Sequence, residues 1–180
     1  DYQVAGLIPH EYWRAPNFGV DLEQIRKRGQ GYLPGLSRNT RYQIRRSRRV
    51  CEAEGNLEFG RAETVEEALA LFEAISPLHR QRWGSQSGFY NERFIAFHRR
   101  FVREGFLAGK VDLYYLRVDG RLYGCLYNFV HEKRAYFYLG GLVNSANSHL
   151  KPGLLMHALC IEDYLQRGFI YYDFMGGDSQ

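Results

Sequence analysis

Cysteine is scarce in this chain, and no long apolar run is present. Among the 180 residues only Cys51, Cys125 and Cys160 carry thiols, and no CxxC spacing occurs. Disulfide frameworks and zinc knuckles need paired or clustered thiols, so we expect three free, buried cysteines. The longest apolar runs fall well short of the roughly 20 residues of a membrane-spanning helix, and no signal-peptide pattern precedes them. We therefore expect a soluble, cytoplasmic protein.

Clustered carboxylates and metal-ligand spacings are missing as well, which argues against a nuclease and predicts no bound metal. No repeat period is visible. The hydrophobic share of 45%, with 14 Tyr and 12 Phe, is typical of an aromatic-rich fold that contains a sheet. The length fits one domain. Because the chain starts at Asp1 without Met and stops at Gln180 just after a strand-like run, we expect a fragment of a longer protein.

The net charge of +4 comes from the first 50 residues, which contain ten Lys and Arg against four Asp and Glu. Six arginines lie between Arg38 and Arg49, with no acidic residue among them. On a helix these arginines share one arc, opposite Thr40, Ile44, Ser47 and Cys51. The arc predicts either a solvated helix face or an anion-binding surface. Its partner would be a polysaccharide-linked acceptor, an acidic membrane surface or RNA.

The sequence of the first third of the chain indicates few regular elements. Residues 1–35 are interrupted by Pro and Gly and are expected to be irregular, apart from a short helix near Leu22–Arg28. A helix over Leu36–Glu54 and a strand over Leu57–Ala62 follow.

Two helices separated by a polar loop are expected between residues 64 and 105. Thr64 and Glu67 form a capping box, in which hydroxyl and carboxylate bind free backbone amides, so the first helix begins there. Ser76-Pro77 either ends this helix or begins another segment. The second helix covers Asn91–Glu104 and ends at Gly105. Its buried side is expected to carry Phe94, Phe97, Phe101 and Val102.

Beyond Gly105 the pattern changes from helical to extended. Strands over Val111–Val118 and Arg121–His131 flank Asp119-Gly120, a strong signal of a β-hairpin, and Arg134–Leu142 adds a third strand. A helix opens at Lys151-Pro152-Gly153, with proline at its first turn, and runs up to Gly168. Phe169–Phe174 then forms a strand that the helical crossover places parallel to the third strand.

This order of elements resembles the GNAT (N-acyltransferase) fold, an α/β fold with a mixed, mostly antiparallel sheet and flanking helices. Particular segments are similar to the acetyltransferase domains of bacterial cellulose- and exopolysaccharide-biosynthesis proteins, which are relatives of the Fem peptidyltransferases. They are Leu36-Ser37-Arg38, Arg45-Arg46, Arg48-Arg49, Glu54-Gly55, His79-Arg80-Gln81-Arg82-Trp83, Asp119-Gly120-Arg121-Leu122-Tyr123-Gly124, Tyr136-Phe137-Tyr138-Leu139-Gly140-Gly141, Lys151-Pro152-Gly153-Leu154-Leu155 and Gly168-Phe169-Ile170-Tyr171-Tyr172-Asp173-Phe174. The resemblance covers Leu36 to Gly177. It implies a GNAT-like domain over 36–180 behind an irregular segment over 1–35, as one half of a two-domain protein.

The resemblance further implies an acyltransferase that moves an acetyl or other acyl group from acyl-CoA to an amine or hydroxyl of a small-molecule, glycan or peptide acceptor, in polysaccharide or cell-envelope biosynthesis. The donor pyrophosphate would bind where the helix opens, because a helix N-terminus has free amides and the positive end of the dipole. We expect the donor site at Gly140, Gly141, Lys151, Gly153, Leu154 and Leu155. The usual motif of the superfamily, Gln or Arg followed by Gly-x-Gly or Gly-x-Ala, is absent, so this site is inferred from position.

Acyl transfer needs a proton acceptor near the nucleophile and hydrogen-bond donors that face the oxyanion. Asp173, at the end of an otherwise apolar strand, is the expected base or orienting group. His79 would act as base or, with Arg82, bind an anionic acceptor, and Tyr138 would serve as general acid. The expected anion-binding residues are Arg45, Arg49 and Arg82. Each of these residues also has a structural interpretation, as a surface, capping or sheet residue.

Two other functions stay open. In a Fem-like transferase the donor would be an aminoacyl-tRNA, and the arginine arc is compatible with RNA. The other is a GNAT-like fold kept as a non-catalytic binding module, which the absent motif favours.

Overall fold

The computed structural model describes residue 8 and residues 17–176, and its elements follow the expected order. The helices are α1 (Leu22–Lys27), α2 (Arg38–Glu54), α3 (Val65–Trp83), α4 (Glu92–Leu107) and α5 (Pro152–Gln166). The strands are β1 (Gly19–Asp21), β2 (Leu57–Arg61), β3 (Val111–Val118), β4 (Arg121–His131), β5 (Arg134–Leu142) and β6 (Tyr171–Asp173). The expected irregular segment over 1–35 lies partly outside the described residues, and its short helix is confirmed as α1.

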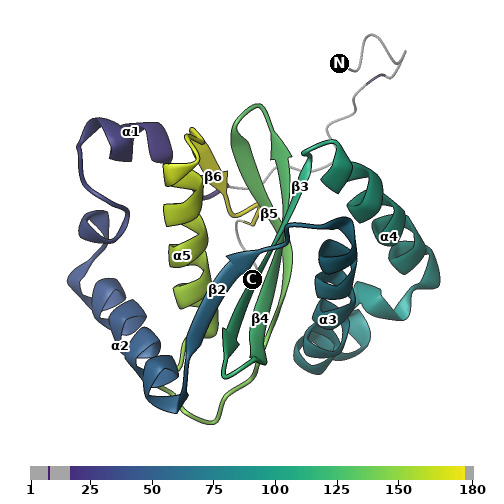
Figure 1. The fold of residues 1–180 in the computed structure, drawn as a ribbon, viewed down its shortest axis with the longest axis horizontal. Helices are drawn as coiled ribbons and strands as arrows, with labels where there is room; N and C mark the ends of the chain where they lie inside the picture. The colour runs from purple at the N-terminus through teal and green to yellow at the C-terminus, as the bar shows by residue number, and fades with distance from the viewer. Residues whose placement is uncertain (1–7, 9–16, 177–180) are drawn as a thin grey trace.

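The six strands form one sheet in the order β1-β6-β5-β4-β3-β2 (Figure 1). The meander of β3, β4 and β5 is antiparallel, as expected. Asp119 and Gly120 both have positive φ, 48° and 73°, which is the backbone of the tight turn that Asp-Gly favours. The second hairpin turn uses Glu132 and Lys133, also at positive φ. The expected α/β fold with a mixed, mostly antiparallel sheet is therefore confirmed.

The fifth and sixth strands are parallel, as the helical crossover requires, but they stay together only briefly. Arg134–Tyr136 of β5 pairs with Tyr171–Asp173 of β6. Beyond Tyr136, β5 continues to Leu142, whereas β6 ends at Asp173. The sheet therefore opens along one edge of β5, next to the start of α5.

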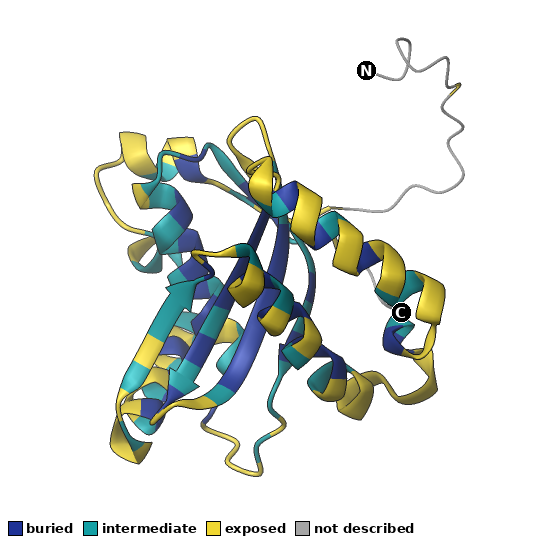
Figure 2. Cartoon of the chain, turned by 45° about the vertical axis from the view of Figure 1, so that its right-hand side comes forward, coloured by how far each residue is buried: buried dark blue, intermediate teal, exposed yellow. Residues whose placement is uncertain are grey.

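Helices cover both faces of the sheet. Figure 1 shows α1, α2 and α5 on one side, and α3 and α4 on the other. The core on the α5 side includes Leu22, Ile44, Ile161 and Tyr172, and the core on the α3 side includes Phe72, Ile75, Val102 and Tyr127. In Figure 2 the outer faces of these helices carry the colour of exposed residues, and the faces toward the sheet carry the colours of buried and intermediate ones. Within the described residues, no helix combines the length and apolarity needed to cross a membrane.

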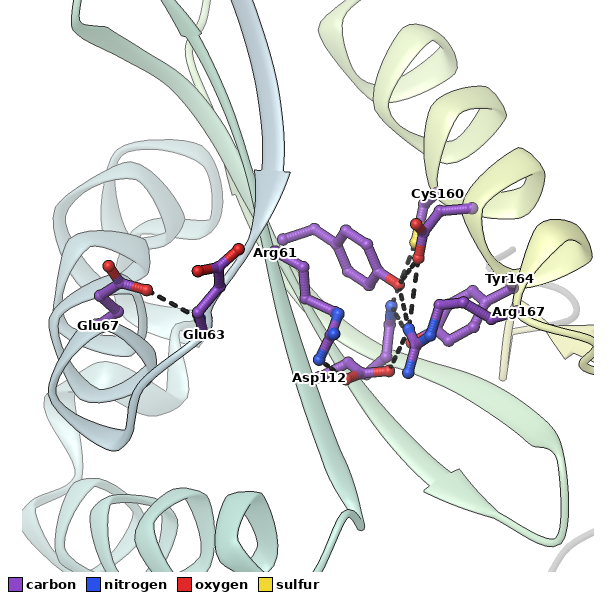
Figure 3. Close-up of polar contacts among 10 residues, drawn as sticks. Arg61, Glu63, Glu67, Asp112, Cys160, Tyr164 and Arg167 are labelled. Atoms are coloured by element: carbon purple, nitrogen blue, oxygen red, sulfur yellow. Dashed lines mark hydrogen bonds and ion pairs between the residues drawn. The ribbon is translucent and has the colours of Figure 1, made fainter.

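A network of charged and hydroxyl groups fixes the C-terminal end of α5 to the sheet (Figure 3). Asp112 of β3, only 4% exposed, accepts hydrogen bonds from Arg61 Nη1 at 3.1 Å and Arg167 Nη1 at 2.9 Å. Arg167 Nη1 also contacts the Tyr114 hydroxyl at 2.6 Å, and that hydroxyl donates to Asp163 Oδ2 at 2.6 Å. Strand and helix are thus joined by ionic contacts in a partly buried site.

Three expectations about the helices on the α3 side are wrong. Helix α3 runs through Ser76-Pro77 without a break. Pro77 has no N–H to donate, and its exposed position leaves the unpaired carbonyl one turn earlier near solvent. Helix α4 continues past Gly105 to Leu107, and the left-handed residue after it is Gly109. Gly105 is needed for packing instead, since a Cβ there would lie 2.7 Å from Val111 Cγ2. Phe97 is 60% exposed, and His98 occupies the buried position.

Several boundaries also differ from expectation. Helix α2 starts at Arg38, two residues later than expected, because Ser37 is its N-cap and accepts from Thr40 N. Thr64 accepts from Glu67 N at 3.1 Å as the capping box predicts, but Glu67 Oε2 accepts from Glu63 N instead of Thr64 N. Strand β6 is shorter than Phe169–Phe174, and strand β1, which pairs antiparallel with it, was not expected.

Candidate functional site

A cleft lies at the C-terminal end of β5, where the sheet opens. Its volume is about 450 Å³. It is lined by Leu78, Gln81, Arg82, Leu142, Val143, Asn144, Ser145, Asn147, Ser148, Leu150, Lys151, Pro152, Gly153 and Leu154. Of the expected donor-site residues, Lys151, Gly153 and Leu154 therefore line one cleft, and Arg82 from the end of α3 faces them.

The start of α5 gives this cleft unsatisfied hydrogen-bond donors. Pro152 is in the first turn and has no N–H, and the side chain of the N-cap residue Lys151 accepts no capping bond. The amides of Gly153 and Leu154 precede the first intrahelical bond, which Leu155 N makes to Lys151 O. No hydrogen bond within the described residues uses these two amides. Free amides, the positive end of a helix dipole and a nearby ammonium are the features that favour an anion at a helix start.

A buried serine of α2 holds this terminus in place. Lys151 N donates to Ser47 Oγ at 2.9 Å, and Ser47 is fully buried. Asn147 supports the preceding loop, since His149 N donates to its side chain and Leu150 N to its carbonyl. Sequence reasoning assigned Ser47 only to the packing stripe of α2. The signal for more was a hydroxyl between Ile44 and Cys51 on that stripe.

Replacing Ser47 by alanine is expected to lower the free energy of unfolding by about 1 kcal/mol, because the Lys151 amide loses its partner. Urea denaturation followed by circular dichroism would measure the change. Ser85→Ala, at an exposed position of the 3₁₀ turn Gly84–Gln86, serves as the control and is expected to change nothing. Equal midpoints for Ser47→Ala and the parent chain would show that the contact does not stabilise the cleft.

Gly140, Gly141 and Leu155 lie next to the cleft but do not line it. A Cβ on Gly141 would lie 2.9 Å from the backbone of Ile75, so this glycine lets β5 pack closely on α3. A Cβ on Gly140 would lie 3.0 Å from Cys125 O, and Leu155 is 1% exposed in the core. These residues serve close packing beside the cleft, and their role in donor binding stays a prediction.

His79 supports the loop that follows α3. Its Nδ1 lies 2.9 Å from Ser87 Oγ, and its ring packs between Trp83 and Phe89. Burial, and then the charge of Arg82, lower the pKa of His79, so the imidazole is neutral near pH 7. A neutral imidazole can accept a proton, as the sequence-based hypothesis requires.

Tyr138 of β5 contacts a histidine that sequence reasoning missed. His98 of α4 is 4% exposed, with Nε2 3.1 Å from the Tyr138 hydroxyl and Nδ1 3.3 Å from the Tyr127 hydroxyl. Burial lowers the pKa of His98 and raises that of Tyr138. The available signal was a histidine four residues after Phe94, on the apolar face of α4. Instead we expected Phe97 to be buried.

Asp173 is 6% exposed, and both carboxylate oxygens already accept hydrogen bonds. Asn17 Nδ2 donates to Oδ2 at 2.8 Å, and Met175 N donates to Oδ1 at 2.7 Å. The side chain thus ties the segment before β1 to the end of β6. No hydrogen bond or ring contact among the described residues links Asp173, His79 and Tyr138 to one another.

The arginines of α2 form a separate cationic surface. An open hollow on the helix, outside the cleft at the start of α5, is lined by Arg38, Arg41, Tyr42, Arg45, Arg48 and Arg49. Arg48 pairs with Glu52 at 2.7 Å, whereas no ion pair within the described residues involves Arg45 or Arg49. The first turn of α2 contains no acid to offset its basic residues. Such uncompensated charge at a helix N-terminus opposes the dipole and favours an anionic partner.

Comparisons with known proteins agree with this geometry. A family model described as "Acetyltransferase (GNAT) domain" matches residues 38–180. A search of curated proteins finds no match. Among solved structures, similarity extends to FemX, with a TM-score of 0.69 and 12% identity over 95% of this chain and 56% of that one.

Two further solved structures are similar. One is the C-terminal domain of a putative lysylphosphatidylglycerol synthetase from Agrobacterium fabrum, with a TM-score of 0.60 and 16% identity over 92% of this chain and 48% of that one. The other is L-PGS from Bacillus licheniformis, with a TM-score of 0.55 and 14% identity over 89% of this chain and 44% of that one. The chain thus spans about half the length of these structures, and at such identities the similarity concerns the fold.

Proposed function

The chain belongs to the acetyltransferase (GNAT) domain family, and from this premise we propose that it transfers an acyl group from acyl-coenzyme A to an amine or hydroxyl acceptor in polysaccharide or cell-envelope biosynthesis. The observation that carries the proposal is the cleft at the start of α5. There the unpaired amides of the first helical turn and the side chains of Lys151 and Arg82 surround a space of about 450 Å³. Volumes of this order are typical of small-molecule sites.

The cleft residues fit the anionic part of such a donor. The free amides of Gly153 and Leu154 and the Lys151 ammonium would bind its pyrophosphate, and the Arg82 guanidinium would balance the charge. The edge of β5 beyond Tyr136 has no β6 partner. Its backbone groups would pair with the amides of an extended pantetheine chain, as an added strand would.

In the chemical step, the acceptor nitrogen or oxygen attacks the thioester carbonyl and loses a proton, and coenzyme A leaves as the thiol. We propose His79 or Asp173 as the group that takes up this proton, and Tyr138 as a group near the carbonyl. His79 is suited by its neutral imidazole, whereas Asp173 would have to release Asn17 or share it with the acceptor. An anionic acceptor would bind Arg82, Arg45 or Arg49.

Coenzyme A is expected to raise the melting temperature of the protein, and Gly153→Glu to abolish the increase. The new carboxylate would repel the phosphates at the helix terminus, and its Cβ would already lie 3.1 Å from Leu142 Cδ1. Differential scanning fluorimetry and isothermal titration with coenzyme A and acetyl-CoA would measure both effects. Ala96→Glu adds the same charge at an exposed position of α4 and should keep the increase. The absence of any shift with several acyl-CoA donors would count against the proposal.

A second candidate is a transferase that uses aminoacyl-tRNA, and the arginine surface of α2 favours it. Exposed guanidinium groups along one helix face suit a phosphodiester backbone. Ribonuclease treatment separates the two donors, because activity with acyl-CoA would survive it and activity with aminoacyl-tRNA would not.

A non-catalytic binding module is a further candidate, and it is favoured by the separation of the expected catalytic side chains. Such a module would bind coenzyme A without turnover.

A further inference from the structure

Tyr127, His98 and Tyr138 form a line of hydrogen-bonded side chains between α4 and the sheet. We propose that this line is a directed hydrogen-bond chain, and that it ends in the Tyr138 O–H group, which donates to the carbonyl oxygen of the bound acyl group. The assignment of that ligand rests on the proposed acyl transfer. The direction in which the hydrogen bonds are donated follows from the contacts of the three side chains and does not depend on that function. His98 is then a positioning residue for Tyr138.

The direction follows from the buried hydroxyl at the inner end. Tyr127 is fully buried, and within the described residues its hydroxyl has only one hydrogen-bond partner, His98 Nδ1. If Nδ1 carried a proton, the Tyr127 O–H would be left as an unsatisfied buried donor, which is costly. Tyr127 therefore donates to Nδ1, and Nδ1 is the unprotonated ring nitrogen.

The state of Nε2 follows from the charge of the ring. Burial lowers the pKa of His98, so its imidazole is neutral near pH 7 and carries one N–H, at Nε2. This N–H donates to the Tyr138 oxygen, 3.1 Å away. The hydrogen of the Tyr138 hydroxyl is then free to donate to a ligand. Within such a chain each hydrogen bond polarises the next one.

The backbone of β5 sets Tyr138 apart from its neighbours. Tyr127 pairs with Leu139 and Asn128 with Phe137, so Tyr138 is an extra residue at a β-bulge. Bulges redirect side chains and are frequent next to active sites. The bulge comes two residues after Tyr136, the last β5 residue that pairs with β6, so Tyr138 stands where the sheet opens.

The half-buried ring of Tyr138 contacts two other rings. It stacks on Phe129, with ring centroids 4.6 Å apart, and lies 5.0 Å from the His98 ring. Burial raises the pKa of Tyr138, so the phenol stays protonated near pH 7. A fixed, protonated phenol is suited to donate to an oxyanion as it develops, without a proton being transferred. This role differs from the general acid expected from the sequence.

The direction can be tested without any activity. In protein labelled with ¹⁵N at histidine, two-bond ¹H–¹⁵N spectra report the tautomer of His98, whose signals are assigned from their loss in His98→Gln. We expect the Nε2–H form at pH 7. Tyr127→Phe should convert it to a mixture, whereas Tyr115→Phe, a hydroxyl deletion at Glu58 on the β2–β3 edge, should not. An Nδ1–H form in the parent chain would overturn the proposal.

The ligand is tested by binding and by turnover. Tyr138→Phe should remove any preference of the protein for acetyl-CoA over coenzyme A in calorimetric titrations, while its affinity for coenzyme A stays within about threefold of the parent value. With an amine acceptor, kcat should fall by about 10²–10³-fold with little change in the donor KM, as when one oxyanion donor is lost. Tyr115→Phe should change neither.

The outcomes separate the two proposals. Full activity and an unchanged donor preference in Tyr138→Phe would overturn the role of the phenol while acyl transfer stands. If no acyl-CoA binds to or reacts with the parent chain, the proposed donor and the carbonyl ligand of Tyr138 both fall. In that case the tautomer of His98 alone still tests the proposed direction of the hydrogen-bond chain.

Discussion

Replacing Asp112 by alanine is expected to lower the free energy of unfolding by about 3–5 kcal/mol, the usual cost of removing one partner from a buried ion pair. The Asp112 carboxylate is 4% exposed and accepts from both Arg61 and Arg167. Without it, the Arg167 guanidinium, whose side chain is 29% exposed, keeps Asp163 and the Tyr114 hydroxyl as its hydrogen-bond partners within the described residues. Urea denaturation, with the slope compared between variants, would measure the loss.

An exposed ion pair provides the contrast. Arg100 Nε pairs with Glu104 Oε1 at 2.7 Å on the outer face of α4. Solvent screens such pairs, so Glu104→Gln is expected to leave the unfolding midpoint unchanged. A loss below about 1 kcal/mol for Asp112→Ala would mean that the network in Figure 3 does little to hold α5 on the sheet.

The meander and the crossover could be predicted because their signals are local. Asp119-Gly120 tolerates the positive φ of both turn residues, and the strands on either side of it have the expected bounds. The parallel pairing of β5 and β6 follows from the helix between them, since two parallel strands in one sheet need a crossover. Local turn chemistry and the general rule for crossover connections therefore account for most of the sheet.

The errors arise where tertiary packing overrides local preference. Gly105 resembles a helix end, yet it lies within α4, and a glycine is needed there because Val111 leaves no room for a Cβ. Pro77 resembles a helix break, yet the packing of Ala68, Phe72 and Ile75 on the sheet continues α3 past it. Strand β1 is three residues long, too short for a periodic pattern, and it exists because β6 offers an edge.

The same distinction holds for the candidate site. Lys151, Gly153 and Leu154 are adjacent in sequence at a helix start, so a positional argument could place them in one cleft. Ser47 binds Lys151 across 104 positions, and no local pattern links them. The contact of His98 with Tyr138 likewise depends on the β-bulge and on the rotation of α4. Sequence reasoning therefore brought three of the expected donor-site residues to one cleft but missed the groups that support them.

A half-buried histidine makes the fold sensitive to acid. His157 of α5 is enclosed by Phe137 and Phe174, with Nδ1 2.9 Å from the Tyr172 hydroxyl. Burial lowers the pKa of His157 from 6.5 to about 4. Between these pH values the unfolded chain binds a proton at His157 that the folded chain does not. The contribution of His157 to the free energy of unfolding is therefore full above pH 6.5 and is lost as the pH falls toward 4.

The expected loss is about 3 kcal/mol at pH 4, since each unit of pKa difference corresponds to about 1.4 kcal/mol. Urea denaturation at a series of pH values between 7 and 4 would measure it. His157→Gln is the matched variant, because its amide can still contact the Tyr172 hydroxyl but does not titrate. Its stability should therefore fall less steeply, with the residual slope coming from His79 and His98, whose pKa values burial also lowers. Equal slopes in the two proteins would show that His157 is protonated in the folded chain as readily as in the unfolded one.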